Sequence, residues 1–241
     1  MKPLSHIPNF ITCLNLLCGC LGIILLFQGN ILMAAFLIWI AALLDFFDGF
    51  FARLLKAYSP MGKELDSLAD MVSFGVLPAM ILFVLIENST ESLFLPYLAL
   101  LVAAFSALRL ANFNIDTRQT ENFIGLPTPA NAIFISSFPF IISEENNFLN
   151  HLLLNEWFLV SIAIVFSLLL VAELPLFSLK FKSYKWSENK IRFSFIILSV
   201  ILLVFLQFIA IPIIIVVYII ISLIQTYTLK RNLKQNLTSC H

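Results

Sequence analysis

Two stretches of this sequence, DFFDGFFAR at residues 45–53 and GKELDSLAD at residues 62–70, decide how the chain folds. They place four aspartates in apolar surroundings, spaced Asp-x2-Asp in the first stretch and Asp-x3-Asp in the second. A charged side chain at the middle of a bilayer costs about 2.5 kcal/mol or more, so residues of this kind usually serve a function. The four acids therefore indicate a functional site on two neighbouring helices.

The composition around these stretches is typical of an integral membrane protein. Of the 241 residues, 61% are hydrophobic and 12% charged, and the mean hydropathy is +0.99. A helix that spans a bilayer needs about 20 mostly apolar residues. Eight segments are candidates, near residues 8–28, 31–55, 62–86, 92–115, 128–143, 153–174, 192–209 and 211–229, although the fifth is short and the last two are separated only near Pro212. We therefore expect an all-α, polytopic transmembrane helix bundle that forms one domain, residues 1–241.

The basic residues predict the orientation of this bundle. With eight crossings and an inside N-terminus, all 14 lysines and arginines fall in or close to segments on one side. The opposite loops contain none; they lie near residues 29–30, 87–91, 144–152 and 210. Because cytoplasmic loops are enriched in Lys and Arg, both termini should be cytoplasmic. The expected location is a multi-pass membrane protein, as in a bacterial inner membrane, with the acidic site on the cytoplasmic side. The net charge of zero gives no indication of a nucleic-acid partner.

Small residues accompany the acids in the first of the two helices. At about 100° per residue, Asp45 and Asp48 lie about 60° apart, and Ala52 returns to within about 20° of Asp45. Gly49 lies on the same side. This face therefore combines two carboxylates with two residues that leave room for a bulky ligand.

The second helix repeats this combination. Gly62, Asp66 and Asp70 follow at intervals of four, which places them on one face. A short turn at Ser59-Pro60 joins the two helices and makes them antiparallel neighbours, with Pro60 suited to the start of a helix. All four acids can therefore converge at one depth in the cytoplasmic half of the bilayer.

Four converging carboxylates need cations in a medium of low dielectric constant. Oxygen ligands favour Mg²⁺ or Mn²⁺, and two such ions could hold both the entering and the leaving oxygen of a phosphoryl group. Acids within membrane helices also occur in transporters, so a divalent-cation transporter is the alternative from a different functional class. A transport pathway would need polar groups through both halves of the bilayer, whereas the charges here gather on one side.

The complete pattern resembles the signature of the CDP-alcohol phosphatidyltransferases. Its fixed positions are all present: Asp45, Asp48, Gly49, Ala52, Arg53, Gly62, Asp66 and Asp70. The resemblance implies a membrane enzyme that transfers a phosphatidyl group from a CDP-linked lipid to an alcohol and releases CMP. Three further motifs, MVSFGVLPA at 71–79, RLANFN at 109–114 and GLPTPA at 125–130, resemble the membrane-embedded phosphatidylserine synthases of that family. The implied substrates are CDP-diacylglycerol and L-serine. Another alcohol, such as glycerol phosphate, is the alternative.

The resemblance also implies roles for individual residues. The metal ligands would be Asp45, Asp48, Asp66 and Asp70, and Asp70 would also be the catalytic group that accepts the proton of the serine hydroxyl. The CDP-lipid would be bound at Gly49, Ala52, Arg53 and Gly62, with Asn9 and Thr12 nearby. Asn9 and Thr12 could equally cap a helix or form hydrogen bonds between helices instead of binding the lipid.

Serine needs a cation for its carboxylate, and Arg109 is the candidate, with Asn112 and Asn114 as additional polar contacts. The alternative for Arg109 is an anchor at the end of its helix. The loop from Gly125 to Pro129 could close the pocket.

The resemblance extends from the N-terminus to about residue 185, and the expected phosphatidyltransferase core is residues 1–175. Residues 176–191 form a basic segment that is expected at the membrane interface, where it could contact membrane lipids. The two C-terminal spans, residues 192–229, are apolar and are candidates for a homodimer contact.

Overall fold

The computed structural model describes residues 6–115, 123–144, 147–176 and 189–238. Most of these residues are helical. The longer helices are α1 (Ile7–Phe27), α2 (Ile31–Leu54), α3 (Pro60–Asp70), α4 (Leu77–Glu87), α5 (Leu100–Ile115), α6 (Thr128–Ser143), α8 (Glu156–Val171), α9 (Lys190–Leu206) and α10 (Ala210–Thr238). The shorter elements are the π-helix η2 (Met71–Val76), η3 (Leu95–Ala99), α7 (Asn147–Leu153), η5 (Gln207–Ile209) and the strands β1 (Phe123–Ile124) and β2 (Pro175–Leu176).

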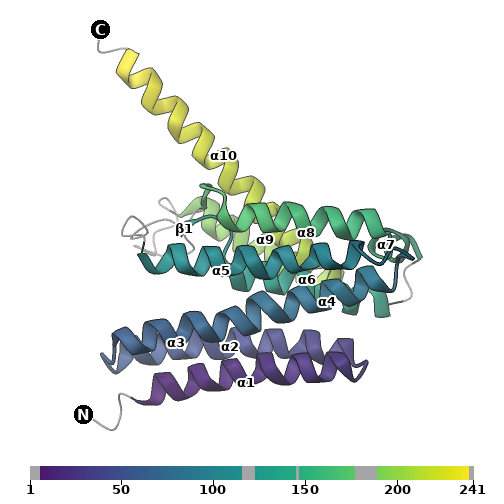
Figure 1. The fold of residues 1–241 in the computed structure, drawn as a ribbon. Coiled ribbons are helices and arrows are strands. Elements are labelled where there is room, and N and C mark those ends of the chain that lie inside the picture. The colour runs from purple at the N-terminus through teal and green to yellow at the C-terminus, as the bar shows by residue number, and fades with distance from the viewer. Residues whose placement is uncertain (1–5, 116–122, 145–146, 177–188, 239–241) are drawn as a thin grey trace. The chain divides into compact units, whose positions relative to one another are not determined.

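These elements group into two compact units. The first contains α1 to α5 together with α6, α7 and α8, and the second contains both strands, α9 and α10. In the first unit, α1, α2 and the helical run from α3 to α4 lie side by side (Figure 1). The residues that carry the acidic pattern all belong to this first unit.

The loop between α1 and α2 is built for a tight reversal. Gly29 has a φ of +81°, a left-handed conformation that favours glycine. Asn30 caps α2, since its side-chain oxygen accepts a hydrogen bond of 3.2 Å from the amide of Met33. This cap satisfies one of the free N–H groups at the start of α2 and fixes where that helix begins.

The turn between α2 and α3 is set in a similar way. Ser59 caps α3, and its Oγ accepts a hydrogen bond of 2.9 Å from the amide of Gly62. Pro60 occupies the first helical turn, where its missing N–H group has no cost. Because this cap fixes the start of α3, it fixes the height of Asp66 relative to the acids of α2.

A π-helix interrupts the long helical run from Pro60 to Glu87. It covers Met71–Val76 and begins directly after Asp70. Short π-helical turns inside α-helices often occur at functional sites. Helix α1 packs closely against this segment and the start of α4: a Cβ atom on Gly19 would lie 2.6 Å from Oγ of Ser73 in η2, and a Cβ on Gly22 would overlap the side chain of Leu77 in α4. Close approach of α1 therefore depends on these two glycines.

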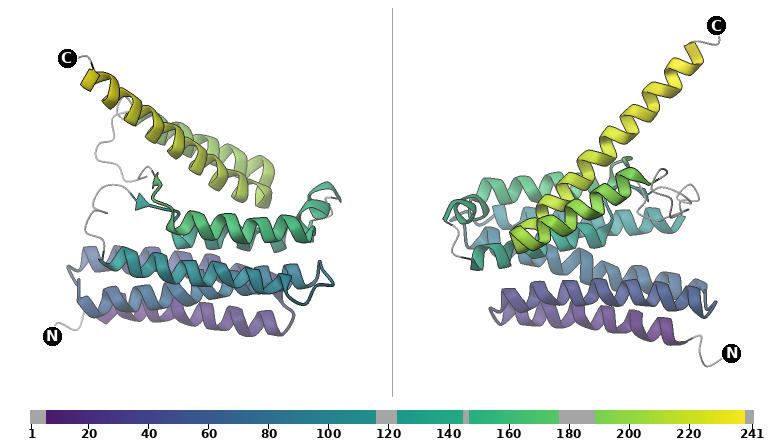
Figure 2. Two further views of the ribbon diagram at one scale, coloured as in Figure 1. Left: turned by 45° about the horizontal axis from the view of Figure 1, so that its top comes forward. Right: turned by 180° about the vertical axis from the view of Figure 1, so that it is seen from behind.

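In the second unit, α9 and α10 lie side by side as a helical hairpin (Figure 2). The strands β1 and β2 pair antiparallel, with Phe123 opposite Leu176 and Ile124 opposite Pro175. Next to this pair, the amide of Gly125 donates a hydrogen bond of 2.9 Å to the carbonyl of Leu174. Most of the basic segment predicted at 176–191 falls on residues 177–188, outside the described part of the chain.

The helical class predicted from the sequence is confirmed, with the two short strands as an addition. Each of the eight predicted spans corresponds to a helical segment. Five helical segments of the described chain are long and apolar enough to cross a membrane: residues 7–27, 31–54, 60–87, 95–115 and 190–225. Helices α6 and α8 are apolar but have 16 residues each. The chain is therefore an integral membrane protein, while the count of eight crossings and the side of the termini stay predictions.

Candidate active site

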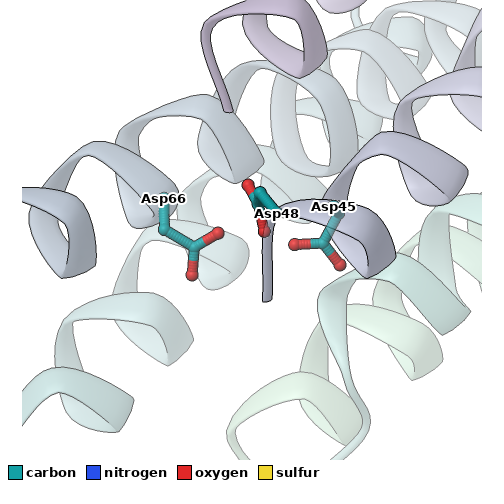
Figure 3. Close-up of side chains that lie close together, drawn as sticks. All are labelled: Asp45, Asp48 and Asp66. Atoms are coloured by element: carbon teal, nitrogen blue, oxygen red, sulfur yellow. The ribbon is translucent and has the colours of Figure 1, made fainter. Parts of the chain in front are cut away.

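Three of the four predicted acids come together in the first unit. One carboxylate oxygen each from Asp45, Asp48 and Asp66 lies within 4.8 Å of the other two. Figure 3 shows Asp45 and Asp48 projecting from α2 toward Asp66 of α3. The antiparallel pairing that the Ser59-Pro60 turn predicts therefore does bring acids of both helices together.

Helix α1 contributes to this acidic cluster through Thr12. The hydroxyl of Thr12 lies 2.6 Å from Oδ2 of Asp48, and both side chains are buried. Hydrogen bonds to a charged group are among the stronger ones, contributing about 1.5–3 kcal/mol. The sequence leaves two interpretations of Thr12, as a contact to the CDP-lipid or as a residue that caps a helix or hydrogen-bonds between helices. The contact with Asp48 supports hydrogen bonding between helices. The same side chain also borders the cavity described below.

Asp70 lies outside this group of three in the described structure. It is buried, and its Oδ1 accepts a hydrogen bond of 3.2 Å from Nδ2 of Asn15 on α1. The backbone of Asn15 is held in turn, because Oγ of Ser73 donates to its carbonyl at 2.9 Å. Asn15 therefore orients Asp70, and the role of Asp70 as a metal ligand stays a prediction.

A cavity of about 200 Å³ opens beside the acids. It is bordered by parts of α1, α2, α3 and the turn between the last two. The lining residues are Pro8, Asn9, Thr12, Asp48, Gly49, Ala52, Ala57, Tyr58, Ser59, Gly62, Lys63 and Asp66. Five of the six residues predicted to bind the CDP-lipid are among them. The cavity and the acidic cluster therefore form one site.

The two glycines of the pattern have different surroundings. A Cβ atom on Gly49 would meet no atom of the described residues within 4 Å, so this position faces open space at the cavity. A Cβ on Gly62 would lie 3.1 Å from both Oδ1 of Asn9 and Oγ of Ser59. Gly49 thus leaves room for a ligand, whereas Gly62 permits the cap of α3 and the approach of α1.

Arg53 is the predicted lipid-binding residue that does not line the cavity. Its Nε donates a hydrogen bond of 3.0 Å to the carbonyl of Gly49, one turn earlier on α2. This contact holds the guanidinium along its own helix, next to the open position of Gly49. A role in binding the nucleotide stays a prediction.

The predicted serine contacts separate into buried and exposed groups. Arg109 is buried on α5, and its Nη1 donates a hydrogen bond of 3.3 Å to the carbonyl of Leu170 on α8. Asn112 is exposed. Asn114 is bound to α3, since its Nδ2 donates to Oγ of Ser67 at 2.9 Å and to Oε2 of Glu64 at 3.3 Å. Asn114 therefore connects two helices in the structure, and serine binding by these three residues stays a prediction.

Several residues of the site were not identified from the sequence. Tyr58 and Lys63 line the cavity, and Asn15 holds Asp70. Asn15 had a detectable signal, because an amide in an apolar span usually has a polar partner. It also follows Thr12 at an interval of three, which places both on one face of α1.

The acidic cluster fits a hard divalent cation. The donors are carboxylate oxygens from two helices, as Mg²⁺ and Mn²⁺ prefer. Oδ1 of Asp66 is buried and has no hydrogen-bond partner within the described chain. An unpartnered buried oxygen is costly, and a bound cation would satisfy it. Asp45, Asp48 and Asp66 are therefore the residues that could hold a metal ion.

Comparison with known proteins agrees with this geometry. The sequence profile described as CDP-alcohol phosphatidyltransferase matches residues 5–170. A protein of Bacillus subtilis named CDP-diacylglycerol–serine O-phosphatidyltransferase is 42% identical over 130 residues, which cover 52% of this chain and 71% of that protein. A protein with the same name in Helicobacter pylori J99 is 36% identical, over 56% of this chain and 57% of that protein. Another in Methanocaldococcus jannaschii is 35% identical, over 60% of this chain and 65% of that protein.

Proposed function

Because the chain belongs to the CDP-alcohol phosphatidyltransferase family, we propose that it transfers the phosphatidyl group of CDP-diacylglycerol to the hydroxyl of L-serine. The products are phosphatidylserine and CMP. The observation that carries this proposal is the meeting of three carboxylates from two helices beside a cavity lined by small residues. The names of the relatives support serine as the acceptor.

The acids of the site bind divalent cations in this proposal. Asp45, Asp48 and Asp66 supply oxygens from α2 and α3, and Asp70 adds a further carboxylate one turn beyond Asp66. Mg²⁺ or Mn²⁺, as two ions when fully bound, would neutralise the charge of the diphosphate and of the departing CMP. Thr12 keeps Asp48 oriented toward this position through its 2.6 Å contact.

The nucleotide part of the lipid occupies the cavity in this proposal. Gly49 and Ala52 expose the backbone of α2 to it, and Asn9, Tyr58 and Lys63 supply polar groups around it. Lys63 brings a positive charge to the same cavity as the diphosphate. Small residues on α2 permit the close approach that a larger side chain would prevent.

Asp70 is proposed as the group that takes the serine proton. Asn15 holds Oδ1 of Asp70 by a donated hydrogen bond, which leaves Oδ2 for the proton transfer. The serine oxygen forms a bond to the lipid-side phosphorus, and the bond from that phosphorus to the oxygen of CMP breaks. The serine proton moves to Asp70 as the new bond forms, which makes the hydroxyl a better nucleophile.

Arg109 is the proposed partner of the serine carboxylate. A guanidinium has five N–H donors, and its contact with Leu170 holds it inside the first unit. The alternative interpretation is that Arg109 anchors α5 to α8, and the same contact supports it. A change in serine affinity alone, without a loss of stability, would distinguish binding from anchoring.

The site is proposed to open to the cytoplasm. The turn that joins α2 to α3 lies at the same end as Arg53, Lys56 and Lys63, and basic residues favour the cytoplasmic side. Serine and CMP can then exchange with the cytoplasm while the acyl chains stay in the bilayer. A site at one end of the bundle also favours a transferase over a cation transporter, which needs a continuous pathway.

The test uses purified protein with CDP-diacylglycerol, Mg²⁺ or Mn²⁺ and a panel of labelled alcohols. We expect CMP release that depends on serine, and label from serine in the lipid product. Release that depends on glycerol phosphate and not on serine would identify the other acceptor. Full activity in Asp66→Asn would contradict the site itself.

A further inference from the structure

Asn131 is a buried amide without a hydrogen-bond partner in the described part of the chain. It lies in the first turn of α6 with no exposed surface. Neither Oδ1 nor Nδ2 has a hydrogen-bond partner among the residues that the structure describes. Burial of an amide without a hydrogen bond costs about 2–7 kcal/mol, depending on the reference state. A side chain with both an unpaired donor and an unpaired acceptor is therefore suited to bind something besides protein.

The position of α6 along α2 gives the depth of Asn131. Nε1 of Trp39 donates a hydrogen bond of 2.8 Å to Oγ of Ser136, so these two residues lie at one level. Helices α2 and α6 run in opposite directions (Figure 1). Asp45 lies six residues after Trp39 along α2, a displacement of about 9 Å. Asn131 lies five residues before Ser136 along α6, about 7.5 Å, and the displacement has the same direction because the helices are antiparallel. Asn131 therefore lies at nearly the same depth as Asp45.

A second contact gives the depth of Arg109. A Cβ atom on Gly75 would lie 3.1 Å from Cβ of Ser106, so α5 and η2 meet there. From this level, Asp70 lies five residues back, directly before η2, and Arg109 lies three residues on along α5, about 4.5 Å. Both displacements have the same direction, because α5 runs opposite to the helical run from α3 to α4 (Figure 1). Arg109 is therefore within about one helical turn of the depth of Asp70.

Because Asp48 and Asp70 lie at similar distances along the chain from the Ser59-Pro60 turn, the two depths belong to one buried layer of the first unit. Helix α6 packs against both α2 and η2, the two elements that flank the carboxylates. Asn131 and Arg109 are both buried, with exposed fractions of 0% and 7%. The layer thus contains a proton acceptor, a guanidinium and an amide with a donor and an acceptor.

We propose that Asn131 binds the amino-acid end of the acceptor alcohol. This inference rests on the proposed transfer to serine. Nδ2 donates to the serine carboxylate, and Oδ1 accepts from the serine ammonium, so both unpaired groups gain partners. Glycerol phosphate lacks an ammonium group and could offer Oδ1 only a neutral hydroxyl. Asn131 is therefore a specificity-determining residue that favours an amino-acid acceptor.

The test variant is Asn131→Leu, which keeps a similar volume and removes both polar groups. A hydrogen bond to a charged group contributes about 1.5–3 kcal/mol, which corresponds to about a 10- to 150-fold change in affinity. We expect the KM for serine to rise at least about 10-fold, with the KM for CDP-diacylglycerol unchanged. The serine-induced rise in Tm of the purified protein should also disappear.

Ser137→Ala is the matched control. Ser137 lies on the same helix with no exposed surface, and its Oγ donates to the carbonyl of Phe134 at 2.7 Å. This variant should keep the wild-type KM for serine.

Two outcomes separate the inference from the proposed function. The inference is wrong if the wild type releases CMP with serine and Asn131→Leu keeps the wild-type KM for serine with a higher Tm. The amide then has only a structural role. If the wild type shows no serine-dependent CMP release, the proposed function fails, and the inference with it. Should Asn131→Leu not fold, Asn131→Ala, which also removes both polar groups, is measured in the same way and carries the same expectations.

Discussion

The hydroxyl of Thr12 on α1 lies 2.6 Å from Oδ2 of Asp48 on α2, across 36 residues of sequence. This contact connects α1 to the acidic cluster and limits the orientations that the Asp48 carboxylate can adopt. Orientation matters because cations that bind several carboxylates need their oxygens in fixed positions. The first helix is thus part of the proposed metal site although it supplies no carboxylate.

Thr12→Val removes this hydrogen bond and keeps the shape of the side chain. We expect the metal concentration that gives half-maximal CMP release to rise about 10-fold, in line with the loss expected when a residue that orients a ligand is replaced. The conservative variant Thr12→Ser keeps the hydroxyl and should behave like the wild type. Equal metal dependence in Thr12→Val and the wild type would show that Asp48 needs no support from α1.

Asn15→Leu tests the contact with Asp70. Without the donated hydrogen bond, the carboxylate loses its fixed orientation, and kcat should fall about 10-fold or more, which is part of the roughly 100- to 10,000-fold that general acid–base catalysis contributes. The KM for serine should stay near the wild-type value, since Asn15 does not contact the acceptor in this account. A fall in affinity for serine with unchanged kcat would assign Asn15 to binding.

The control for Asn15→Leu is Asn30→Ala, at the other end of the same helix pair. Asn30 caps α2 through the amide of Met33, and the loss of such a cap costs about 0.5–2 kcal/mol of stability. This variant should have a lower Tm and an unchanged kcat. The pair of variants separates loss of stability from loss of proton transfer.

Gly49→Val tests the proposed nucleotide cavity. A Cβ on Gly49 meets nothing within 4 Å, so the protein should fold, while the added methyl groups occupy space at the cavity. We expect the KM for CDP-diacylglycerol to rise at least about 10-fold, a loss of about 1.4 kcal/mol in binding. Leu43→Phe, at an exposed position of the same helix, is the control and should leave this KM unchanged.

Gly19→Val tests the close packing of α1 on the π-helix. The new Cβ would lie 2.6 Å from Oγ of Ser73 and 3.0 Å from its Cα, so the helices must separate. Overpacking of this kind typically costs about 1–3 kcal/mol, and the Tm in detergent should fall accordingly. Leu21→Val, at an exposed position of α1, should change the Tm little. Equal Tm values for the two variants would contradict tight packing at Gly19.

The acidic cluster was predictable because the residues that determine its geometry lie close together in the sequence. The spacing of Asp45 and Asp48, the short turn at Ser59-Pro60 and the interval from Gly62 to Asp66 together determine how α2 and α3 face one another. The structure confirms that acids from these two helices meet. Helical periodicity and one tight turn are enough for such a prediction.

Contacts between distant elements could not be predicted in the same way. The partner of Asn114 on α3 and the partner of Arg109 on α8 depend on the register between helices, which local periodicity does not encode. The π-helix after Asp70 also breaks the 3.6-residue repeat, so extrapolation along the helix fails beyond that residue. Asn131 comes directly after the GLPTPA motif, yet only the folded protein shows that it has no hydrogen-bond partner among the described residues.

Serine-dependent CMP release, measured against free Mg²⁺ or Mn²⁺ for the wild type and Asp66→Asn, tests whether Asp45, Asp48 and Asp66 hold the cation needed for phosphatidyl transfer. We expect saturable metal activation of the wild type, abolished by a chelator and restored by added metal. Asp66→Asn should lose activity at least about 100-fold, which corresponds to about 2.7 kcal/mol in the activation barrier. Metal-independent activity of the wild type, or the same metal dependence in both proteins, would contradict this role of the three acids.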